Sequence, residues 1–444
     1  MALIGVRKLA RDTAVLTVAG ILMRCVGMLW QAQLARRIGA AGLGLWQLVL
    51  SVNALAATLA ISGIRFTATR LASEELGARR GSGAAAVIRA CLLYALFSGC
   101  AAMLLLRALA EPVGFLWLSD ARSVQSLRTL SLTMPMVSLC AVLGGWFLAS
   151  GRAWVSAAIQ FAEQLLGIAC ILALLNRVNG GDLAESCAAI AKGSLLADAS
   201  SLLLAAIAYM SDPRRGRASP VRGLAGRLLR TALPLALSAY ARVGLTTLEH
   251  LLVPKKLRLY GLSAEHALAG YGTVTGMVFP ILFFPACLLT ALAELTVPML
   301  TLAQVRRDTD AIRRTTALLL RCTLLYALAV AALLCLCGEA LGLAVYRTVG
   351  LGRWLRLLSP LVVLSYLDTV TDGCLKGLGQ MLRSMCYNVA DALIGVGLTV
   401  WLLPRHGLEG WIFVLYFCEG FNFALSFGRL AKVTGLLKRR QIQK

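Results

Sequence analysis

The chain has 444 residues, of which 59% are hydrophobic and only 15% are charged, and its formal net charge is +23. A soluble domain carries about 25% charged residues, and the mean hydropathy here is +0.77, so a soluble globular protein is excluded. Apolar residues come in repeated blocks of roughly 20, the length that crosses a bilayer as a helix. We therefore predict an all-α integral membrane protein.

The positive charge and the cysteines do not indicate a nucleic-acid or metal protein. Basic residues gather in the connections between apolar blocks, as the positive-inside rule describes, and no compact basic domain with interleaved aromatic residues is present. Nearly all of the 13 cysteines fall inside apolar blocks, and no CxxC pair occurs, so they are interpreted as small hydrophobic residues. We expect no nucleic-acid partner and no metal site.

No motif for catalysis or nucleotide binding is present. The sequence lacks GxxxxGK[ST] and HExxH, and its loops are too short to form a soluble catalytic domain. We expect a protein that is not an enzyme, needs no cofactor and does not hydrolyse ATP itself.

Twelve membrane spans can be assigned in chain order. The N-terminus is not a cleavable signal, because Arg7, Lys8 and Arg11 precede an apolar run that is too long for one. The predicted spans cover residues 13–35, 43–64, 84–106, 129–150, 153–175, 187–209, 231–253, 268–292, 316–338, 357–377, 385–403 and 408–428.

The distribution of basic residues predicts the topology. With the N-terminus in the cytoplasm, the cytoplasmic segments hold 25 of the 44 lysines and arginines, which supports two cytoplasmic termini in the cell membrane. The longest connection contains six arginines and joins two sets of six spans. We predict an N-terminal bundle over residues 1–210, a basic cytoplasmic linker over 211–230 and a C-terminal bundle over 231–444.

The two sets of spans carry an internal repeat. Leu127–Gly167 aligns with Leu355–Gly395 at an offset of 228, with twelve of the 41 positions identical. Arg89–Leu96 matches Arg321–Leu328 at six of eight positions. A duplication of six spans gives halves with the same orientation, related by an axis along the membrane normal. We predict two pseudo-symmetric six-helix bundles around a central cavity.

Three arginines are candidate substrate-binding residues. Arg24 lies in the middle of the first span and Arg242 is at the matching place in the seventh, while Arg65 ends the second span. A charge at membrane depth is costly, so each is a site candidate, and a guanidinium group can bind a phosphate through two hydrogen bonds. The alternatives are buried structural pairing for Arg24 and Arg242 and an interfacial anchor for Arg65.

Polar and acidic residues in the spans are candidates for coupling to an ion gradient. Glu163 and Asp391 occupy matching positions in the repeat, Asn388 shares a helix face with Asp391, and Glu249 in the seventh span could meet that face. Carboxylates in a membrane cavity can bind a cation or carry a proton. Further acids in the spans are Asp198, Glu294, Asp368, Asp372 and Glu419. The alternative is that these acids neutralise Arg24, Arg242 and Lys376 inside the bundles.

Several segments resemble the multidrug/oligosaccharidyl-lipid/polysaccharide exporter superfamily. The first loop, Ala35–Leu48 (ARRIGAAGLGLWQL), carries the resemblance together with Leu59–Arg65 (LAISGIR) and Arg70–Glu75 (RLASEE). The sequence is most similar to the branch of stage V sporulation protein B and the lipid II flippases. It departs from that branch at Arg65, where a proline is usual.

The resemblance implies a transporter that works by alternating access as a monomer. Its substrate would be an anionic lipid-linked oligosaccharide on an undecaprenyl-pyrophosphate anchor, a peptidoglycan precursor or polysaccharide unit, and membrane lipids would be its other partners. Arg24 and Arg65 match the cavity-lining arginines of the lipid II flippases by position. The alternative is a cation-coupled multidrug exporter of the same superfamily, driven by Na⁺ or H⁺. A membrane enzyme acting on lipid-linked sugars would need a larger outer loop than any here.

Overall fold

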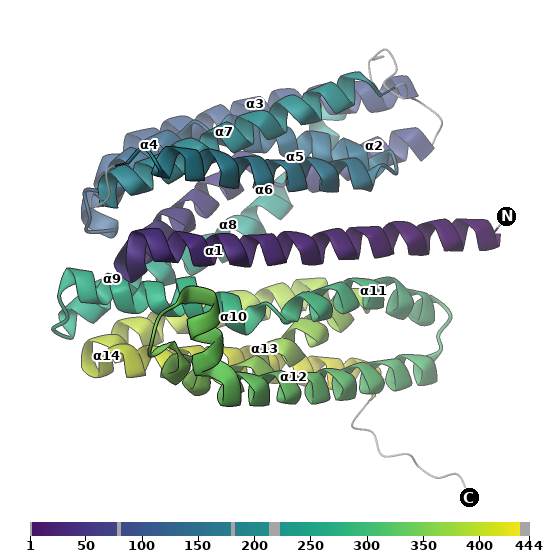
Figure 1. The fold of residues 1–444 in the computed structure, drawn as a ribbon. Coiled ribbons are helices and arrows are strands. Elements are labelled where there is room, and N and C mark those ends of the chain that lie inside the picture. Colours follow the sequence, from purple (N-terminus) through teal and green to yellow (C-terminus); the bar gives the residue numbers. More distant parts are fainter. Residues whose placement is uncertain (1, 78–80, 179–182, 213–222, 436–444) are drawn as a thin grey trace, which may run out of the picture. The chain divides into compact units, whose positions relative to one another are not determined.

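A computed structural model describes residues 2–77, 81–178, 183–212 and 223–435, and every regular element in these ranges is a helix (Figure 1). This confirms the all-α prediction. Two of the elements, η1 and η2, are short π-helices. The elements are α1 (Ala2–Ile61), α2 (Ile64–Gly77), α3 (Gly81–Pro112), η1 (Val113–Trp117), α4 (Ser123–Ser131), α5 (Met134–Ala149), α6 (Ala153–Leu175), α7 (Leu183–Met210), α8 (Leu224–Leu259), α9 (Ala264–Gly272), η2 (Thr273–Val278), α10 (Phe279–Phe283), α11 (Ala286–Val305), α12 (Thr309–Tyr346), α13 (Leu351–Gly377) and α14 (Met381–Thr434).

Within the described residues, seven helical stretches are long and apolar enough to cross a membrane, or eight if α4 and α5, which meet at 45°, form one bent span. Two of them, α1 and α14, each contain two predicted spans. Each is broken by a glycine in a left-handed conformation, Gly39 (φ 69°) in α1 and Gly407 (φ 56°) in α14. A residue with a Cβ atom rarely adopts these angles, so the glycines supply the turns between successive spans.

The eighth predicted span is interrupted. It is built from α9, η2 and α10, then a break at Phe284–Pro285, then α11, which continues to Val305 rather than ending at residue 292. A π-helix frees backbone groups from the regular ladder. Here the Gly276 carbonyl in η2 accepts hydrogen bonds from Gln31 Nε2 (3.2 Å) and Tyr346 Oη (3.3 Å). The irregular backbone is therefore satisfied by α1 and α12.

The chain forms two compact units. Unit 1 comprises Met1–Met23 and Leu45–Leu251, and unit 2 comprises Arg24–Gly44 and Leu252–Lys444. The boundaries fall inside α1 and α8, so the middle of α1 belongs to unit 2 and most of α8 to unit 1. The division into bundles at 211–230 stays a prediction. Residues 213–222 of that linker lie outside the described residues, and α8 already begins at Leu224.

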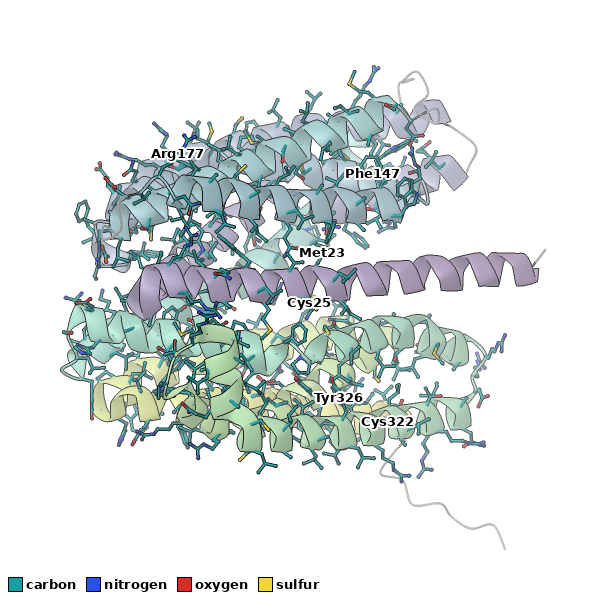
Figure 2. The ribbon with its side chains drawn as sticks, in the orientation of Figure 1. Met23, Cys25, Phe147, Arg177, Cys322 and Tyr326 are labelled. Atoms are coloured by element: carbon teal, nitrogen blue, oxygen red, sulfur yellow. The ribbon has the colours of Figure 1, made fainter. Side chains whose placement is uncertain are left out.

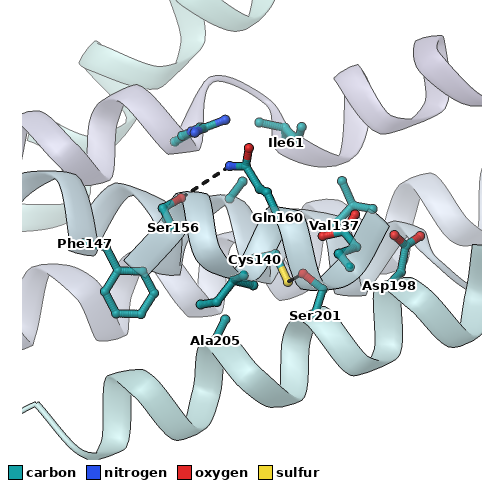
Figure 3. Close-up of a pocket in the computed structure, with 14 residues that line it drawn as sticks. Ile61, Val137, Cys140, Phe147, Ser156, Gln160, Asp198, Ser201 and Ala205 are labelled. Atoms are coloured by element: carbon teal, nitrogen blue, oxygen red, sulfur yellow. Dashed lines mark hydrogen bonds between the residues drawn. The ribbon is translucent and has the colours of Figure 1, made fainter. Parts of the chain in front are cut away.

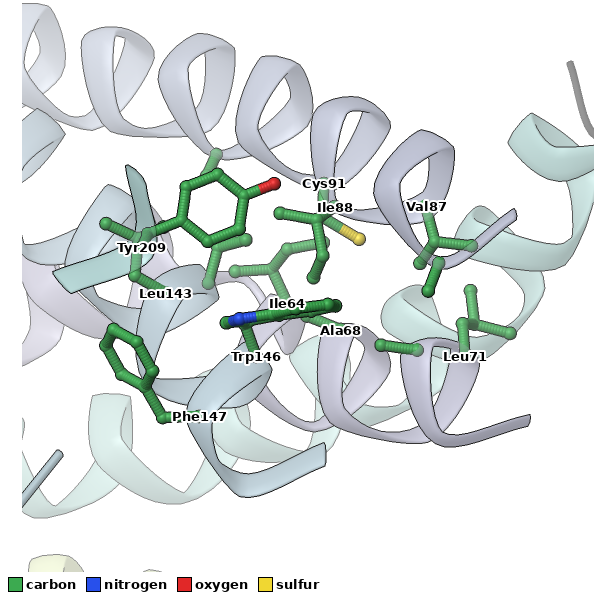
Figure 4. Packing of buried hydrophobic residues seen from close by; sticks show 14 of the residues in the cluster. Ile64, Ala68, Leu71, Val87, Ile88, Cys91, Leu143, Trp146, Phe147 and Tyr209 are labelled. Atoms are coloured by element: carbon green, nitrogen blue, oxygen red, sulfur yellow. The ribbon is translucent and has the colours of Figure 1, made fainter. Parts of the chain in front are cut away.

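Unit 1 is organised around Trp146 of α5, which is fully buried (Figure 4). Its indole packs edge-on against Tyr209 of α7, with ring centroids 5.7 Å apart. The indole Nε1 donates to Asp212 Oδ2 at 3.0 Å, and Arg152 pairs with the same oxygen at 3.2 Å. The carboxylate of Asp212 thus fastens the ends of α5 and α7 together.

Unit 2 is held by tight helix crossings and tyrosine hydrogen bonds. A Cβ atom placed on Gly272 of α9 would lie 2.1 Å from the carbonyl oxygen of Ala40 in α1, and one on Gly44 would lie 2.2 Å from the carbonyl oxygen of Leu268. Small residues allow such close backbone approach in membrane helices. Tyr366 Oη donates to the Leu282 carbonyl at 2.8 Å, which links α13 to α10.

Candidate functional site

A cavity of about 180 Å³ lies within unit 1 among α5, α6 and α7 (Figure 3). Carboxylates, an amide, hydroxyls and one guanidinium group line it, and the rest of its wall is apolar. Its lining residues are Ile61, Arg65, Val137, Cys140, Ala141, Gly144, Phe147, Ser156, Ile159, Gln160, Glu163, Asp198, Ser201 and Ala205. We call it the acidic cavity of unit 1.

Two half-buried carboxylates in this cavity interact electrostatically. Glu163 comes from α6 and Asp198 from α7, and Ser201, one turn after Asp198, lies beside Glu163. Arg65, which is exposed, is the one basic residue among those that line the cavity. Like charges brought together away from water are costly unless a cation or a proton joins them. The arrangement is suited to holding either.

Unit 2 contains a second cluster of polar groups between α13 and α14. Asn422 Nδ2 donates to Asp368 Oδ2 at 3.2 Å and to Asn388 Oδ1 at 3.0 Å. Asp391 and Glu419 lie close enough for their charges to interact with each other and with Asp368. We call these five residues the acidic cluster of unit 2. It contains Asn388 and Asp391, and their predicted role in ion coupling stays a prediction.

Several oxygens of this cluster are buried without a hydrogen-bond partner. Within the described part of the chain, these are Asp368 Oδ1, Asp391 Oδ1 and Asn422 Oδ1. The nearby ammonium group of Lys376 is paired with Asp372 at 2.6 Å. Buried acceptors without donors are rare in folded proteins and mark either strain or the place of an ion or water. Carboxylate and amide oxygens are the ligands that hard cations prefer.

The duplication relates the two sites. At the offset of 228, Gln160 and Glu163 align with Asn388 and Asp391. The contacts extend the match to the last span of each half, because Asp198 interacts with Glu163 as Glu419 does with Asp391. Each unit therefore presents one acid from the fifth span of its half and one from the sixth.

Asp198 and Glu419 were named from the sequence only as further acids in the spans, and their pairing with Glu163 and Asp391 was not predicted. Their numbers differ by 221, seven fewer than the offset of the repeat, because the connection before the last span is shorter in the second half. An alignment of the two halves with a gap in that connection pairs Asp198 with Glu419.

Arg24 belongs to unit 2 and lines a cavity of about 210 Å³ with Gln31, Phe284 and other residues of α1 and α10. Figure 2 labels its neighbours on α1, Met23 and Cys25. The Arg24 side chain is exposed and donates from Nη2 to Thr290 Oγ1 at 3.4 Å. It keeps hydrogen-bonding capacity for an anion, since a guanidinium group has five donor hydrogens.

Arg65 and Arg242 both belong to unit 1 and are exposed. The elements that carry them cross at Gly63, where a Cβ atom would lie 2.7 Å from the carbonyl oxygen of Ala232 in α8. Ser62 and Tyr240 are hydrogen-bonded at the same crossing. In the described residues no ion pair joins Arg24, Arg65 or Arg242 to an acid, whereas Lys376 is paired with Asp372.

Two contacts that the sequence predicted involve residues of different units. Arg24 belongs to unit 2 and Arg242 to unit 1, and Glu249 of unit 1 was expected to meet Asn388 and Asp391 of unit 2. Both contacts stay predictions.

An all-helical membrane protein with matched acidic sites in two units has the architecture of a transporter. The chain belongs to the polysaccharide biosynthesis protein family, whose profile matches residues 9–257. It is 20% identical over 414 residues to stage V sporulation protein B of Bacillus subtilis (strain 168), covering 90% of this chain and 78% of that protein. These matches bear out the resemblance to the exporter superfamily.

Solved structures share the fold. An inward-facing multidrug resistance MATE family transporter of the MOP superfamily superposes with a TM-score of 0.71 at 17% identity, covering 95% of this chain and 99% of that one. A MOP superfamily transporter from Pyrococcus furiosus, described as having a binding pocket of reverse polarity that suggests a different function, gives a TM-score of 0.65 at 17% identity, with 95% and 96% covered. The multi-pass helical membrane fold is thereby confirmed.

Proposed function

We propose that the protein flips an anionic lipid-linked saccharide across the cytoplasmic membrane by alternating access. The substrate is an undecaprenyl-pyrophosphate-linked peptidoglycan precursor or polysaccharide unit. The observation that carries the proposal is Arg24, which lies in the middle of the first predicted membrane span, is exposed beside a cavity and has no ion pair in the described residues, in a chain of the polysaccharide biosynthesis family. An unpaired charge at that depth is costly and is retained where it serves a substrate.

The arginines bind the head group and the carboxylates couple its movement to an ion. Arg24, Arg65 and Arg242 hold the pyrophosphate, since a guanidinium group binds phosphate oxygens through two parallel hydrogen bonds. The lipid tail stays in the bilayer while the saccharide crosses. The protein acts as a monomer with both termini in the cytoplasm.

The two acidic sites take up Na⁺ or H⁺ from the gradient. In unit 1, Glu163 and Asp198 share the ion, and in unit 2 Asn388 and Asp391 hold it with Glu419. The unpartnered oxygens Asp391 Oδ1 and Asp368 Oδ1 support this role in unit 2. Glu249 of α8 is a further candidate for ion coupling. Because a bound cation neutralises the carboxylates, it lowers the cost of moving them through the membrane interior.

The second candidate function is a cation-coupled multidrug exporter. The observation that favours it is the fold shared with multidrug resistance MATE family transporters, together with an acidic cavity that could receive a cationic drug. The discriminating property is the charge of the substrate. Drug resistance on overexpression, lost in Glu163→Gln or Asp391→Asn, supports the exporter; the absence of drug resistance supports the flippase.

Complementation of a flippase-depleted bacterial strain tests the proposal. Arg24→Ala should abolish growth while the protein remains at normal abundance in the membrane, and Arg24→Lys should restore it only in part, because lysine keeps the charge but loses the planar fork. Arg107→Ala is the matched control, since Arg107 is an exposed arginine near the end of α3. Full growth with Arg24→Ala contradicts the role given to Arg24.

A further inference from the structure

Two arginines and an exposed row of phenylalanines lie at the end of unit 2 where α13 begins. Arg353 and Arg356 of α13 are exposed, and together with Leu357, Glu409 and Ile412 they line a cavity of about 690 Å³. This cavity is separate from the acidic cluster of unit 2, since the two share no residue. We call it the basic pocket.

The row of phenylalanines begins one helical turn after the pocket. Phe413 follows Glu409 by four residues on α14, and Phe417 and Phe421 continue at the same spacing, which places all of them on one helix face. Their rings are stacked, with centroids 6.1 Å and 6.3 Å apart. Phe413 is 55% exposed and Phe417 is 43% exposed.

The pocket and the row belong to one continuous surface. Tyr416 Oη, on α14, donates to the Leu357 carbonyl of α13 at 2.7 Å. This hydrogen bond ties the arginine-bearing turns of α13 to the part of α14 between Phe413 and Phe417. Charged and aromatic groups therefore follow each other along the α13–α14 surface, with the charge at the helix ends and the aromatic rings toward the helix middle.

The arginines of the pocket are available to an anion. In the residues that the structure describes, neither Arg353 nor Arg356 has an ion pair, and Arg356 uses Nε for the Gly352 carbonyl at 3.2 Å. Two backbone N–H groups at the start of α13 are already taken, because Glu339 accepts from Gly350 at 2.8 Å and from Gly352 at 2.9 Å. The guanidinium groups are therefore the donors that we consider for an anion.

The residues that line the pocket include two arginines and one carboxylate, that of Glu409. The nearby carboxylate of Glu339 is engaged by the N–H groups of Gly350 and Gly352. Under the predicted topology this end of unit 2 faces away from the cytoplasm, where basic residues are depleted. The positive-inside rule therefore does not account for this pair of arginines.

We propose that the α13–α14 surface binds a membrane lipid with a phosphate head group. The phosphate lies in the basic pocket between Arg353 and Arg356, and the hydrocarbon chain lies along Phe413 and Phe417. Charge complementarity selects the anionic head, and the exposed rings supply an apolar track that starts where the head is held. The inference does not depend on the proposed function, because the lipid here stays in the bilayer and is not transported.

Photo-crosslinking of the full-length protein in detergent micelles tests this site. The probe is phosphatidylglycerol with a diazirine on one acyl chain, and diacylglycerol with the same chain is the probe without a head group. We expect the phosphatidylglycerol probe to label the peptide that contains Phe413 and Phe417, and the diacylglycerol probe to label it at least tenfold less. The double change Arg353→Gln and Arg356→Gln should weaken labelling about tenfold, as expected for two arginines that contact an anionic head group.

Control variants separate the pocket from a general charge effect. Arg107→Gln removes an exposed arginine from α3 in unit 1 and should leave the labelling unchanged. Phe417→Ser keeps the pocket and should reduce labelling of the chain severalfold. A cooperative unfolding transition on heating, followed by circular dichroism, confirms that each variant is folded.

Three outcomes overturn the inference. One is equal labelling by the two probes, and another is labelling that the double arginine change leaves at the wild-type level. The third is complete displacement of the lipid probe by millimolar inorganic phosphate with no effect of Phe417→Ser, since the pocket would then be a site for free anions. Labelling that needs the arginines and the aromatic row together supports it.

Discussion

The crossing of α1 and α9 offers a sharp test of the close helix packing within unit 2. A Cβ atom on Gly272 would lie 2.1 Å from the Ala40 carbonyl oxygen, 2.5 Å from the Gly44 nitrogen and 2.8 Å from the Gly44 Cα. All three neighbours are backbone atoms, so no side-chain rotation relieves the overlap. Carbon atoms pack at about 3.5–4.0 Å, and the two helices must separate by roughly 1 Å or more to accept alanine.

We expect Gly272→Ala to lower the free energy of unfolding by about 3 kcal/mol, at the upper end of the usual cost of overpacking. The matched control is Gly397→Ala in α14, where a Cβ atom meets nothing within 4 Å. That change should leave stability equal or raise it by up to about 1 kcal/mol, because alanine is the better helix former.

Thermal unfolding in detergent, followed by tryptophan fluorescence, measures both variants. Gly272→Ala should unfold several degrees below the wild type and Gly397→Ala at or above it. If Gly272→Ala unfolds at the same temperature as the control, the crossing is looser than the structure describes, and the account of close helix packing in unit 2 is wrong.

Three further predictions concern the anchors and the ion sites. Asp212→Ala should reduce the unfolding free energy by about 3 kcal/mol, because the buried Trp146 indole loses its acceptor; chemical denaturation measures this. Glu339→Ala removes the acceptor for two N–H groups at the start of α13 and should cost about 1–2 kcal/mol in the same assay. Glu163→Gln and Asp391→Asn should each abolish the response of transport to a Na⁺ or H⁺ gradient while substrate binding is kept, as measured in vesicles with and without the gradient.

The stability predictions have control variants. Asp212→Asn keeps an acceptor oxygen and should cost less than Asp212→Ala. Glu111→Gln breaks an exposed ion pair with Arg128 and should change stability by less than about 1 kcal/mol. A gradient response that survives in either carboxylate variant contradicts the assignment of the ion site that the variant alters. Equal stability of Asp212→Ala and Glu111→Gln contradicts the anchoring role of Asp212.

Span length and apolar character sufficed to predict the helical membrane fold, because the bilayer leaves few alternatives for such segments. They did not predict where helices break inside a span. The π-helix at Thr273–Val278 receives hydrogen bonds from Gln31 and Tyr346, and the Pro285 carbonyl at the break accepts one from Tyr326. These donors are distant in sequence. Hydropathy depends only on the residue types along the chain, so it cannot predict such contacts.

The repeat predicted positions that are alike in structure. Gly151 and Gly379, matched at the offset of 228, both have positive φ angles, +71° and +68°. Gly145 and Gly373, also matched, both lie at close helix contacts, where a Cβ atom would fall within 2.8 Å and 2.7 Å of a neighbour. A glycine that serves a turn or a close approach is kept because no other residue fits.

The candidate site was predicted in part. The pairing of Glu163 with Asp391 across the repeat, and of Asn388 with Asp391 on one face, came from the sequence. The sequence did not predict that Asp198 pairs with Glu163 or that Glu419 pairs with Asp391. The residues around Asp198 and Glu419 are not alike in sequence, and only the contacts in the structure show that the two acids are equivalent. The sequence cannot show which residues share a cavity when the helices that carry them are joined by connections of unequal length.

The measurement that tests the central claim most directly is translocation in reconstituted vesicles that contain a fluorescent undecaprenyl-pyrophosphate-linked saccharide. The wild-type protein should move the lipid to the opposite leaflet, Arg107→Ala should do so at the same rate, and Arg24→Ala should not move it above the rate of protein-free vesicles. Translocation by Arg24→Ala at the wild-type rate, or no translocation by the wild type under either a Na⁺ or an H⁺ gradient, would contradict the account.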